Sequence, residues 1–223
     1  GLLRAISIDT NTRLSFPDTF KYLEIKANYE DYEPIYTDGS KHEDRAAAAV
    51  YTEGQANARR LPNSSTIFSA ELKALVMAFQ HISRSENDKF IIFSDSLSSL
   101  QALQGNDIEN PFLMRLIDEY EVLNVEYRKT VILCWIPSHI GIPGNEAADR
   151  AAKAALELPV TEMPIHYADF KTRIKDHIDL LWQQRWDQQI HNKLHGLKPD
   201  LKGARPSVCA NRREEIVSHI SIY

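Results

Sequence analysis

The sequence Trp135-Ile136-Pro137-Ser138-His139-Ile140-Gly141-Ile142-Pro143-Gly144-Asn145-Glu146-Ala147-Ala148-Asp149 joins an apolar segment to an alanine-rich one. Its hydrophobic pattern predicts a β-strand over residues 131–136, then a loop rich in glycine and proline, then a helix. The loop carries His139, and the helix carries Asp149 ten residues later. An imidazole can move protons near neutral pH, and a carboxylate can hold a metal ion. The stretch therefore indicates that these two side chains meet at one site.

The composition sets broad limits on the class of protein. A chain of 223 residues that is 43% hydrophobic can form one domain of ordinary size with appendages, or two small domains. The two cysteines do not suggest a disulfide framework, so we expect an intracellular location, in either nucleus or cytoplasm. Neither a signal peptide nor a long apolar run is visible, so no membrane association is expected. Because the chain begins with Gly1 rather than Met, we interpret it as a piece of a longer protein.

The charge is distributed unevenly along the chain. Residues 33–157 carry 12 Lys and Arg against 18 Asp and Glu, so their net charge is 12 − 18 = −6. Residues 158–223 carry 10 against 8, which gives 10 − 8 = +2. An acidic centre repels phosphates unless divalent cations neutralise part of it. The charge pattern therefore indicates a metal site, or else argues against a nucleic-acid ligand.

The first half of the central segment predicts strands and then a helix. Residues 34–40, 45–51 and 59–68 resemble strands of an antiparallel meander, although the alanines of the second would suit a helix equally well. Residues 68–82 have apolar side chains at the helical period of 3.6. On that helix Glu71 lies about 20° beyond the apolar stripe. We therefore expect Glu71 to point toward the sheet.

The second half alternates strands with helices. It predicts a strand at 90–94, a short helix from 97, a helix opened by Asn110 and Pro111, the strand at 131–136 and the final helix. The order β-β-β-α-β-α-α-β-α predicts an α/β protein with a mixed five-stranded sheet flanked by helices.

Four carboxylates occupy comparable places in this fold. Asp38 and Asp95 end strands, Glu71 faces the sheet, and Asp149 lies near the start of the last helix. Converging carboxylates raise one another's pKa unless cations are present, and hard oxygen ligands favour Mg²⁺ or Mn²⁺ over Zn²⁺. Two such ions about 4 Å apart would suit phosphodiester hydrolysis, with His139 assisting proton transfer or product departure. Singly, each residue is more simply an ordinary surface or loop residue; their combination in order favours a site.

Four motifs in order carry a resemblance to a known family. They are Tyr36-Thr37-Asp38-Gly39-Ser40, Phe68-Ser69-Ala70-Glu71, Phe93-Ser94-Asp95-Ser96, and Ser138-His139 followed by Gly144-Asn145-Glu146-Ala147-Ala148-Asp149. Together they resemble a type-1 ribonuclease H domain over roughly residues 33–157. The segments 61–74 and 95–103 look particularly like the version found in non-LTR retrotransposon reverse transcriptase polyproteins. The expected architecture is thus a ribonuclease H-like sheet with a C-terminal helical extension.

The resemblance implies an activity and a set of site residues. The activity is cleavage of the RNA strand of RNA–DNA hybrids with two Mg²⁺ ions, or Mn²⁺. The implied metal ligands are Asp38, Glu71, Asp95 and Asp149, with His139 as the auxiliary catalytic residue and with Gly39 and Ser40 as contacts to the RNA strand. A reverse transcriptase domain, in cis or in trans, is a further implied partner.

Other functions stay open at this point. Residues 105–129, where some relatives carry a basic handle that grips the hybrid, hold three basic residues against six acidic ones. A catalytically weak remnant that acts as a nucleic-acid-binding or interaction module is therefore an alternative. Another nuclease or an integrase of the same fold superfamily is a third, which the spacing from His139 to Asp149 disfavours.

The two ends are expected to be appendages. Residues 1–32 predict a linker or the end of a preceding domain, and residues 158–223 a helical, partly disordered extension. In that extension Asp169 is predicted to cap a long helix that needs a surface to cover. Its apolar residues recur every fourth position, at Phe170, Ile174, Ile178, Trp182, Trp186, Ile190 and Leu194. Interleaved basic residues allow nucleic-acid contact, but a solvated charged face is the simpler interpretation.

Overall fold

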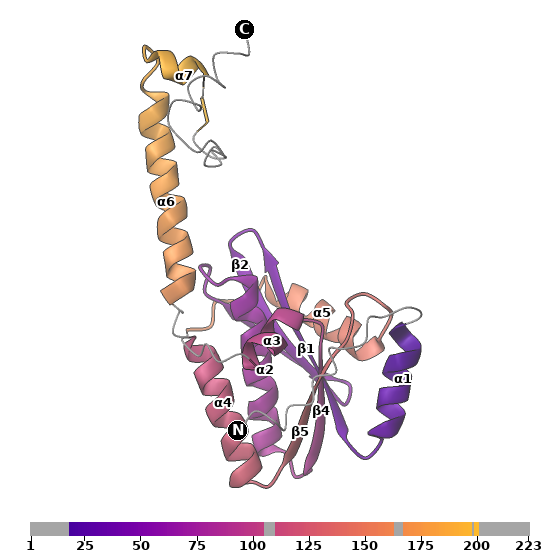
Figure 1. Ribbon diagram of the computed structural model, residues 1–223. Helices are drawn as coiled ribbons and strands as arrows, with labels where there is room; N and C mark the ends of the chain where they lie inside the picture. The colour runs from indigo at the N-terminus through magenta and orange to yellow at the C-terminus, as the bar shows by residue number, and fades with distance from the viewer. Residues whose placement is uncertain (1–17, 105–109, 163–166, 198, 201–223) are drawn as a thin grey trace, which may run out of the picture. The chain divides into compact units, whose positions relative to one another are not determined.

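The computed structural model describes residues 18–104, 110–162, 167–197 and 199–200. The chain divides into two compact units, one up to Phe170 and one from Lys171. The first unit is built on a five-stranded sheet with helices on both faces (Figure 1). Residues 201–223, for which partial disorder is predicted, lie outside the described residues.

The sheet is mixed, as the order of elements predicts. Its strands are β1 (Glu33–His42), β2 (Arg45–Thr52), β3 (Gln55–Leu61), β4 (Lys89–Ser94) and β5 (Thr130–Trp135). They lie in the order β3-β2-β1-β4-β5. The meander β1-β2-β3 is antiparallel, whereas β4 runs parallel to both β1 and β5. The predicted mixed sheet of five strands is therefore confirmed.

The third strand lies earlier in the chain than the sequence pattern predicts. The expected strand at 59–68 is wrong in position, because β3 ends at Leu61. Glu53 and Gly54 both have positive φ, 44° and 82°, and form a two-residue hairpin in which Thr52 pairs with Gln55. Such a turn matches the twist of the flanking strands and starts β3 at once. Residues 62–66 are thereby left to lead into the next helix.

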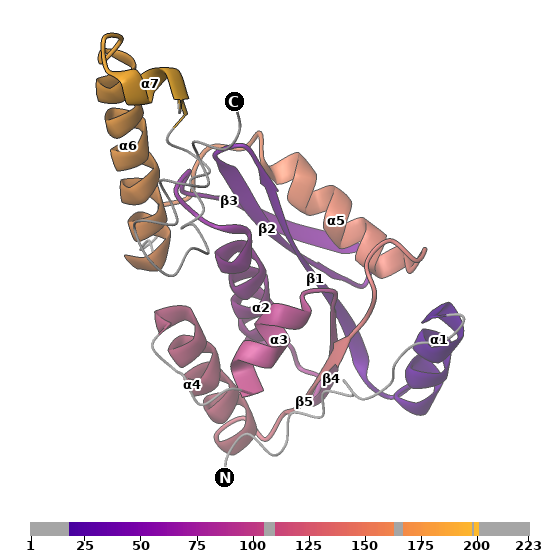
Figure 2. The same cartoon turned by 45° about the horizontal axis from the view of Figure 1, so that its top comes forward.

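Helices cover the two faces of the sheet separately (Figure 2). One face carries α2 (Ile67–Arg84), α3 (Leu97–Gln104) and α4 (Pro111–Val125), and the other carries α5 (Pro143–Ala155) and α1 (Asp18–Asn28). Helix α2 lies between the sheet and α4, so most of its side chains are buried all round. As predicted, Asn110 opens α4: its side chain accepts a hydrogen bond from the Phe112 N–H at 2.9 Å.

The alanines of β2 form a strand rather than the helix that they would equally suit. Ala46 and Ala48 are buried in the core under α2, while Ala47 packs with Ala155 and Leu156 of the α5 side. Because both faces of β2 are covered by helices, only small side chains fit there. Tertiary packing thus determines that this alanine-rich segment is a strand, whereas its local propensity allows either a strand or a helix.

The second unit contains most of α6 (Tyr167–Asp187) and α7 (Lys193–Leu197). Within it, Gln183 Nε2 donates a hydrogen bond to the Pro199 carbonyl at 2.7 Å, and the rings of Trp186 and His195 lie 5.8 Å apart. The predicted long helix is confirmed as far as Asp187, but it ends before Ile190, and Leu194 belongs to α7. Ile178 and Trp182 on α6 are exposed. Across the part of the chain that the structure describes, every helix is too short or too polar to cross a bilayer.

Candidate metal centre

Asp38 and Asp95 are placed side by side by two parallel strands. In the register of β1 and β4, Thr37 pairs with Ser94, so each aspartate is the next residue along. The expectation that Asp38 ends its strand is wrong, because β1 continues to His42, whereas Asp95 follows the end of β4 as expected. The two carboxylates therefore meet where β4 stops and β1 continues, a place where ligands commonly bind in α/β sheets.

Glu71 reaches this place from α2, across a glycine. A Cβ atom added to Gly39 would lie 2.7 Å from the Glu71 backbone nitrogen and 3.0 Å from the Ala70 carbonyl carbon. Only a residue without a side chain lets the helix backbone come so close to β1. Glu71 faces the sheet as its place on the helix predicts, and ligand oxygens of Asp38, Glu71 and Asp95 lie within 4.8 Å of one another.

Burial and mutual repulsion disfavour the charged forms of these acids. Desolvation, with the charges of Asp95 and Asp149 adding to it, raises the pKa of Asp38 to about 8. Desolvation and then the charges of Asp38 and Asp95 raise the pKa of Glu71 to about 9, against a hydrogen bond from the Gly39 backbone. Desolvation also raises the pKa of Asp95, although a hydrogen bond from Asn145 opposes it. Without a cation, the cluster cannot carry its full negative charge at neutral pH.

The hydrogen bonds of the cluster do not satisfy all of its carboxylate oxygens. Asp38 Oδ2 and Glu71 Oε2 are buried and have no hydrogen-bond partner. Such orphaned buried atoms are costly unless something else coordinates them. Carboxylate oxygens from three elements are the donors that hard divalent cations prefer. The residues present therefore fit a divalent metal ion.

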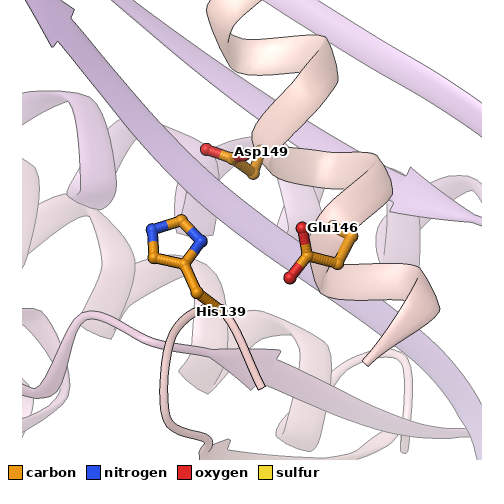
Figure 3. Close-up of side chains that lie close together, drawn as sticks. All are labelled: His139, Glu146 and Asp149. Atoms are coloured by element: carbon orange, nitrogen blue, oxygen red, sulfur yellow. The ribbon is translucent and has the colours of Figure 1, made fainter. Parts of the chain in front are cut away.

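A second group of possible ligands adjoins the first. Its members are His139, Glu146 and Asp149, whose ligand atoms also lie within 4.8 Å of one another (Figure 3). His139 comes from the loop before α5, in a left-handed conformation with φ of 58°, and its ring points toward the two carboxylates of the helix. Lys153, one turn further along α5, donates a hydrogen bond to Asp149 Oδ2 at 2.8 Å. The structure thus brings His139 and Asp149 together and places Asp149 close enough to Asp38 and Asp95 for its charge to act on both.

Two contributions to the site were not singled out from sequence. Glu146 is absent from the expected set of ligands, yet it lies beside His139 and Asp149. The buried side chain of Asn145 donates a hydrogen bond to Asp95 Oδ2 at 3.2 Å. The available signal was helical spacing, since Asn145 and Asp149 are four residues apart and share one face of α5.

The residues expected to touch substrate lie at the same strand. Gly39 packs directly against the backbone of α2. Ser40 is largely buried and pairs with Ala47 of β2. Contact of Gly39 and Ser40 with an RNA strand stays a prediction.

The N-terminus of α2 is capped by a contact with the first turn of α6. Thr66 is the N-cap: its Oγ1 accepts from the Ser69 N–H at 3.1 Å and donates to the buried carboxylate of Asp169 at 2.8 Å. The expectation that Asp169 caps its own helix is therefore wrong, because α6 begins at Tyr167. A carboxylate near the N-terminus of α2 is stabilised by the helix dipole. Asp169 thus supports the helix that carries Glu71.

Fold and site together define an α/β protein with an acidic centre suited to divalent metal. A model of the RNase H family matches residues 30–157. The chain therefore belongs to the RNase H family.

The curated proteins that the chain resembles include viral polyproteins. The Gag-Pol polyprotein of bovine immunodeficiency virus (strain R29) is 33% identical over 129 residues, which are 57% of this chain and 8% of that protein. The Pol polyprotein of equine infectious anemia virus (isolate 1369) is 30% identical over 127 residues, 56% of this chain and 10% of that protein. The chain thus spans about a tenth of the length of these relatives.

Proposed function

We propose that the chain is a metal-dependent endonuclease that hydrolyses the RNA strand of RNA–DNA hybrids. The observation that carries this proposal is the cluster formed by Asp38, Glu71 and Asp95. Two of these acids, Asp38 and Glu71, each have a buried carboxylate oxygen that accepts no hydrogen bond. Membership of the RNase H family supports the reaction class. Phosphodiester hydrolysis needs concentrated positive charge at the reacting phosphate, and the ligand group Asp38, Glu71 and Asp95 consists of acids alone.

The four acids would hold the cofactor, for which we propose two Mg²⁺ ions, with Mn²⁺ as a substitute. Asp38, Glu71 and Asp95 form one ligand group, and Asp149 joins them from α5. When bound, such ions activate a water molecule and stabilise the leaving oxygen. Asn145 holds Asp95 through Oδ2, which restricts the orientation of that carboxylate.

His139 is proposed to move protons at the mouth of this site. Its side chain is exposed, on a loop whose residue 141 is a glycine with φ of 80°. An exposed imidazole near a reacting phosphate can take up or deliver a proton as the product leaves. Glu146 and Asp149 of α5 lie beside it.

The substrate and origin follow from the resemblance of the motifs. An enzyme of this type distinguishes RNA from DNA by contacting the 2′-hydroxyl groups of the RNA. We propose that Gly39 and Ser40 make such contacts, and that the chain derives from a retroelement of the non-LTR type. A reverse transcriptase domain, in cis or in trans, is the proposed partner; relatives named as Pol polyproteins support this.

The test is cleavage of a hybrid labelled on its RNA strand, in Mg²⁺ and then in Mn²⁺. Asp95→Asn is the inactive comparison, because it keeps the shape of the side chain and removes its charge. Cleavage of RNA that disappears in Asp95→Asn would support the nuclease and its metal site together.

A folded protein that cuts no hybrid, even at low salt where binding is strongest, would refute the proposal. It would favour the alternative of a catalytically weak remnant that binds without turnover. The excess of acidic over basic residues in the segment 105–129 agrees with that alternative.

A further inference from the structure

Helix α1 lies outside the residues matched by the family and yet reaches the core beneath the metal centre. The RNase H match begins at residue 30, whereas α1 ends at Asn28. Tyr22 of α1 is only 5% exposed and packs in the same cluster as Tyr36 and Phe93. The edge of its ring meets Phe93, with centroids 5.3 Å apart. A mere linker would leave such a residue exposed.

Tyr36 and Phe93 are the residues that lead to the two aspartates. They pair across β1 and β4, and their rings stack with centroids 5.2 Å apart. Asp38 lies two residues after Tyr36, and Asp95 lies two residues after Phe93. Side chains two residues apart in an extended chain point to the same face. The ring pair and both carboxylates therefore occupy neighbouring positions on one face of the sheet.

Tyr36 also seats the helix that brings the fourth acid. A Cβ on Gly144, in the first turn of α5, would overlap the ring of Tyr36. The adjacent Asn145 holds Asp95, and Asp149 lies one turn further along. The Tyr36 ring of β1 thus contacts both Phe93 of β4 and the start of α5.

The hydroxyl of this ring is held by α1 alone among the described residues. Tyr22 and Tyr36 share a buried hydrogen bond of 2.6 Å between their hydroxyl oxygens. A buried hydroxyl group that has no hydrogen-bond partner costs free energy, which favours a movement toward another partner or a water molecule. Tyr22 therefore restrains the tilt of the Tyr36 ring, in addition to covering the core.

We propose that Tyr22 is a positioning residue for the metal-binding carboxylates, acting through the Tyr36 ring, so that α1 is part of the working nuclease. Tyr22 touches neither metal nor substrate. The inference rests on the proposed metal site, but it does not require turnover of a hybrid.

The test compares Mn²⁺ binding by the full chain and its variants, measured by calorimetry without nucleic acid. Tyr22→Phe keeps the ring and orphans the Tyr36 hydroxyl. Loss of a residue that orients metal ligands weakens metal binding by about 10- to 100-fold, and one step further out we expect about tenfold. In Tyr22→Phe combined with Tyr36→Phe no hydroxyl is orphaned, so Mn²⁺ affinity should return toward that of the original chain.

Tyr29→Phe is the matched control, because Tyr29 packs against the same cluster and its ring meets Tyr32 rather than Tyr36. A purely structural role would lower the melting temperature and leave Mn²⁺ affinity unchanged at a temperature where the variant is folded. That result for Tyr22→Phe overturns the proposal, as does a double variant whose affinity is not restored. Should the single variant not fold, the affinity of the double variant decides in the same way.

The two proposals fail separately. If the original chain binds Mn²⁺ but cuts no hybrid, the proposed nuclease function is refuted while the comparison of affinities still decides the role of Tyr22.

Discussion

Replacing Gly39 by alanine tests how closely α2 must approach β1 for Glu71 to reach the site. The added Cβ would lie 2.7 Å from the Glu71 nitrogen, whereas ordinary contacts begin at 3.4 Å. The helix backbone must therefore retreat by 3.4 − 2.7 = 0.7 Å. Overpacking of this kind costs about 1–3 kcal/mol of stability. A catalytic group displaced by about 1 Å lowers the rate by about 100-fold.

Two measurements separate these effects. Urea denaturation gives the change in the free energy of unfolding, and hybrid cleavage in saturating Mg²⁺ gives the change in kcat. Gly54→Ala is the control: its Cβ would meet nothing within 4 Å, but its φ of 82° is unfavourable for alanine. We expect it to lose about 1–2 kcal/mol of stability and to keep its rate, because only the backbone conformation is strained.

The reasoning would be refuted by Gly39→Ala with its original kcat, whatever its stability. It would equally fail if Gly54→Ala lost as much activity as Gly39→Ala, since stability alone would then explain both.

Three further substitutions test the electrostatics, the helix cap and the packing of the site. Asp38 has a pKa of about 8 in the folded, metal-free protein against 3.8 ordinarily, so the folded state keeps a proton that the unfolded state releases. Stability in EDTA should therefore fall as the pH rises from about 4 to about 8, and Asp38→Asn should make this decline shallower in urea titrations; an unchanged slope would contradict the assignment. Thr66→Ala should cost about 1–2 kcal/mol in urea denaturation, because it removes the cap of α2 and the partner of Asp169, while Thr66→Ser should lose less. Gly144→Ala should cost about 1–3 kcal/mol, because the new methyl group would overlap the Tyr36 ring; an unchanged melting temperature would show that α5 is not seated on that ring.

Helices and strands with a strong local pattern were predictable from the sequence. The apolar stripe of residues 68–82 and the run 90–94 each had one dominant period, and both elements formed where expected. β3 was misplaced, since the hairpin at Glu53 and Gly54 depends on two positive φ angles that a Glu-Gly pair signals only weakly. Asp169 was misassigned because its hydrogen-bond partner, Thr66, is 103 residues away.

The candidate site could be predicted only in its most distinctive residues. Asp95 stands at a strand end, His139 stands in a loop, and Asp38 comes directly before the pair Gly39-Ser40, so local sequence already indicates a functional place at each. Glu146 and Asn145 look like ordinary residues of a helix start, and their roles arise from what α5 faces. Tyr22 had no local signal at all, because its partner hydroxyl belongs to a different element.

Local sequence was therefore sufficient for the types of the elements, their order and the chemical identity of the acids, because periodicity and residue chemistry act over a few neighbouring residues. The distances between those acids depend on the strand register, on the close approach of α2 at Gly39 and on the Tyr36 ring under α5. These are long-range steric relations, and they also determine the raised pKa values of Asp38 and Glu71, since desolvation exists only once the chain has packed around the carboxylates.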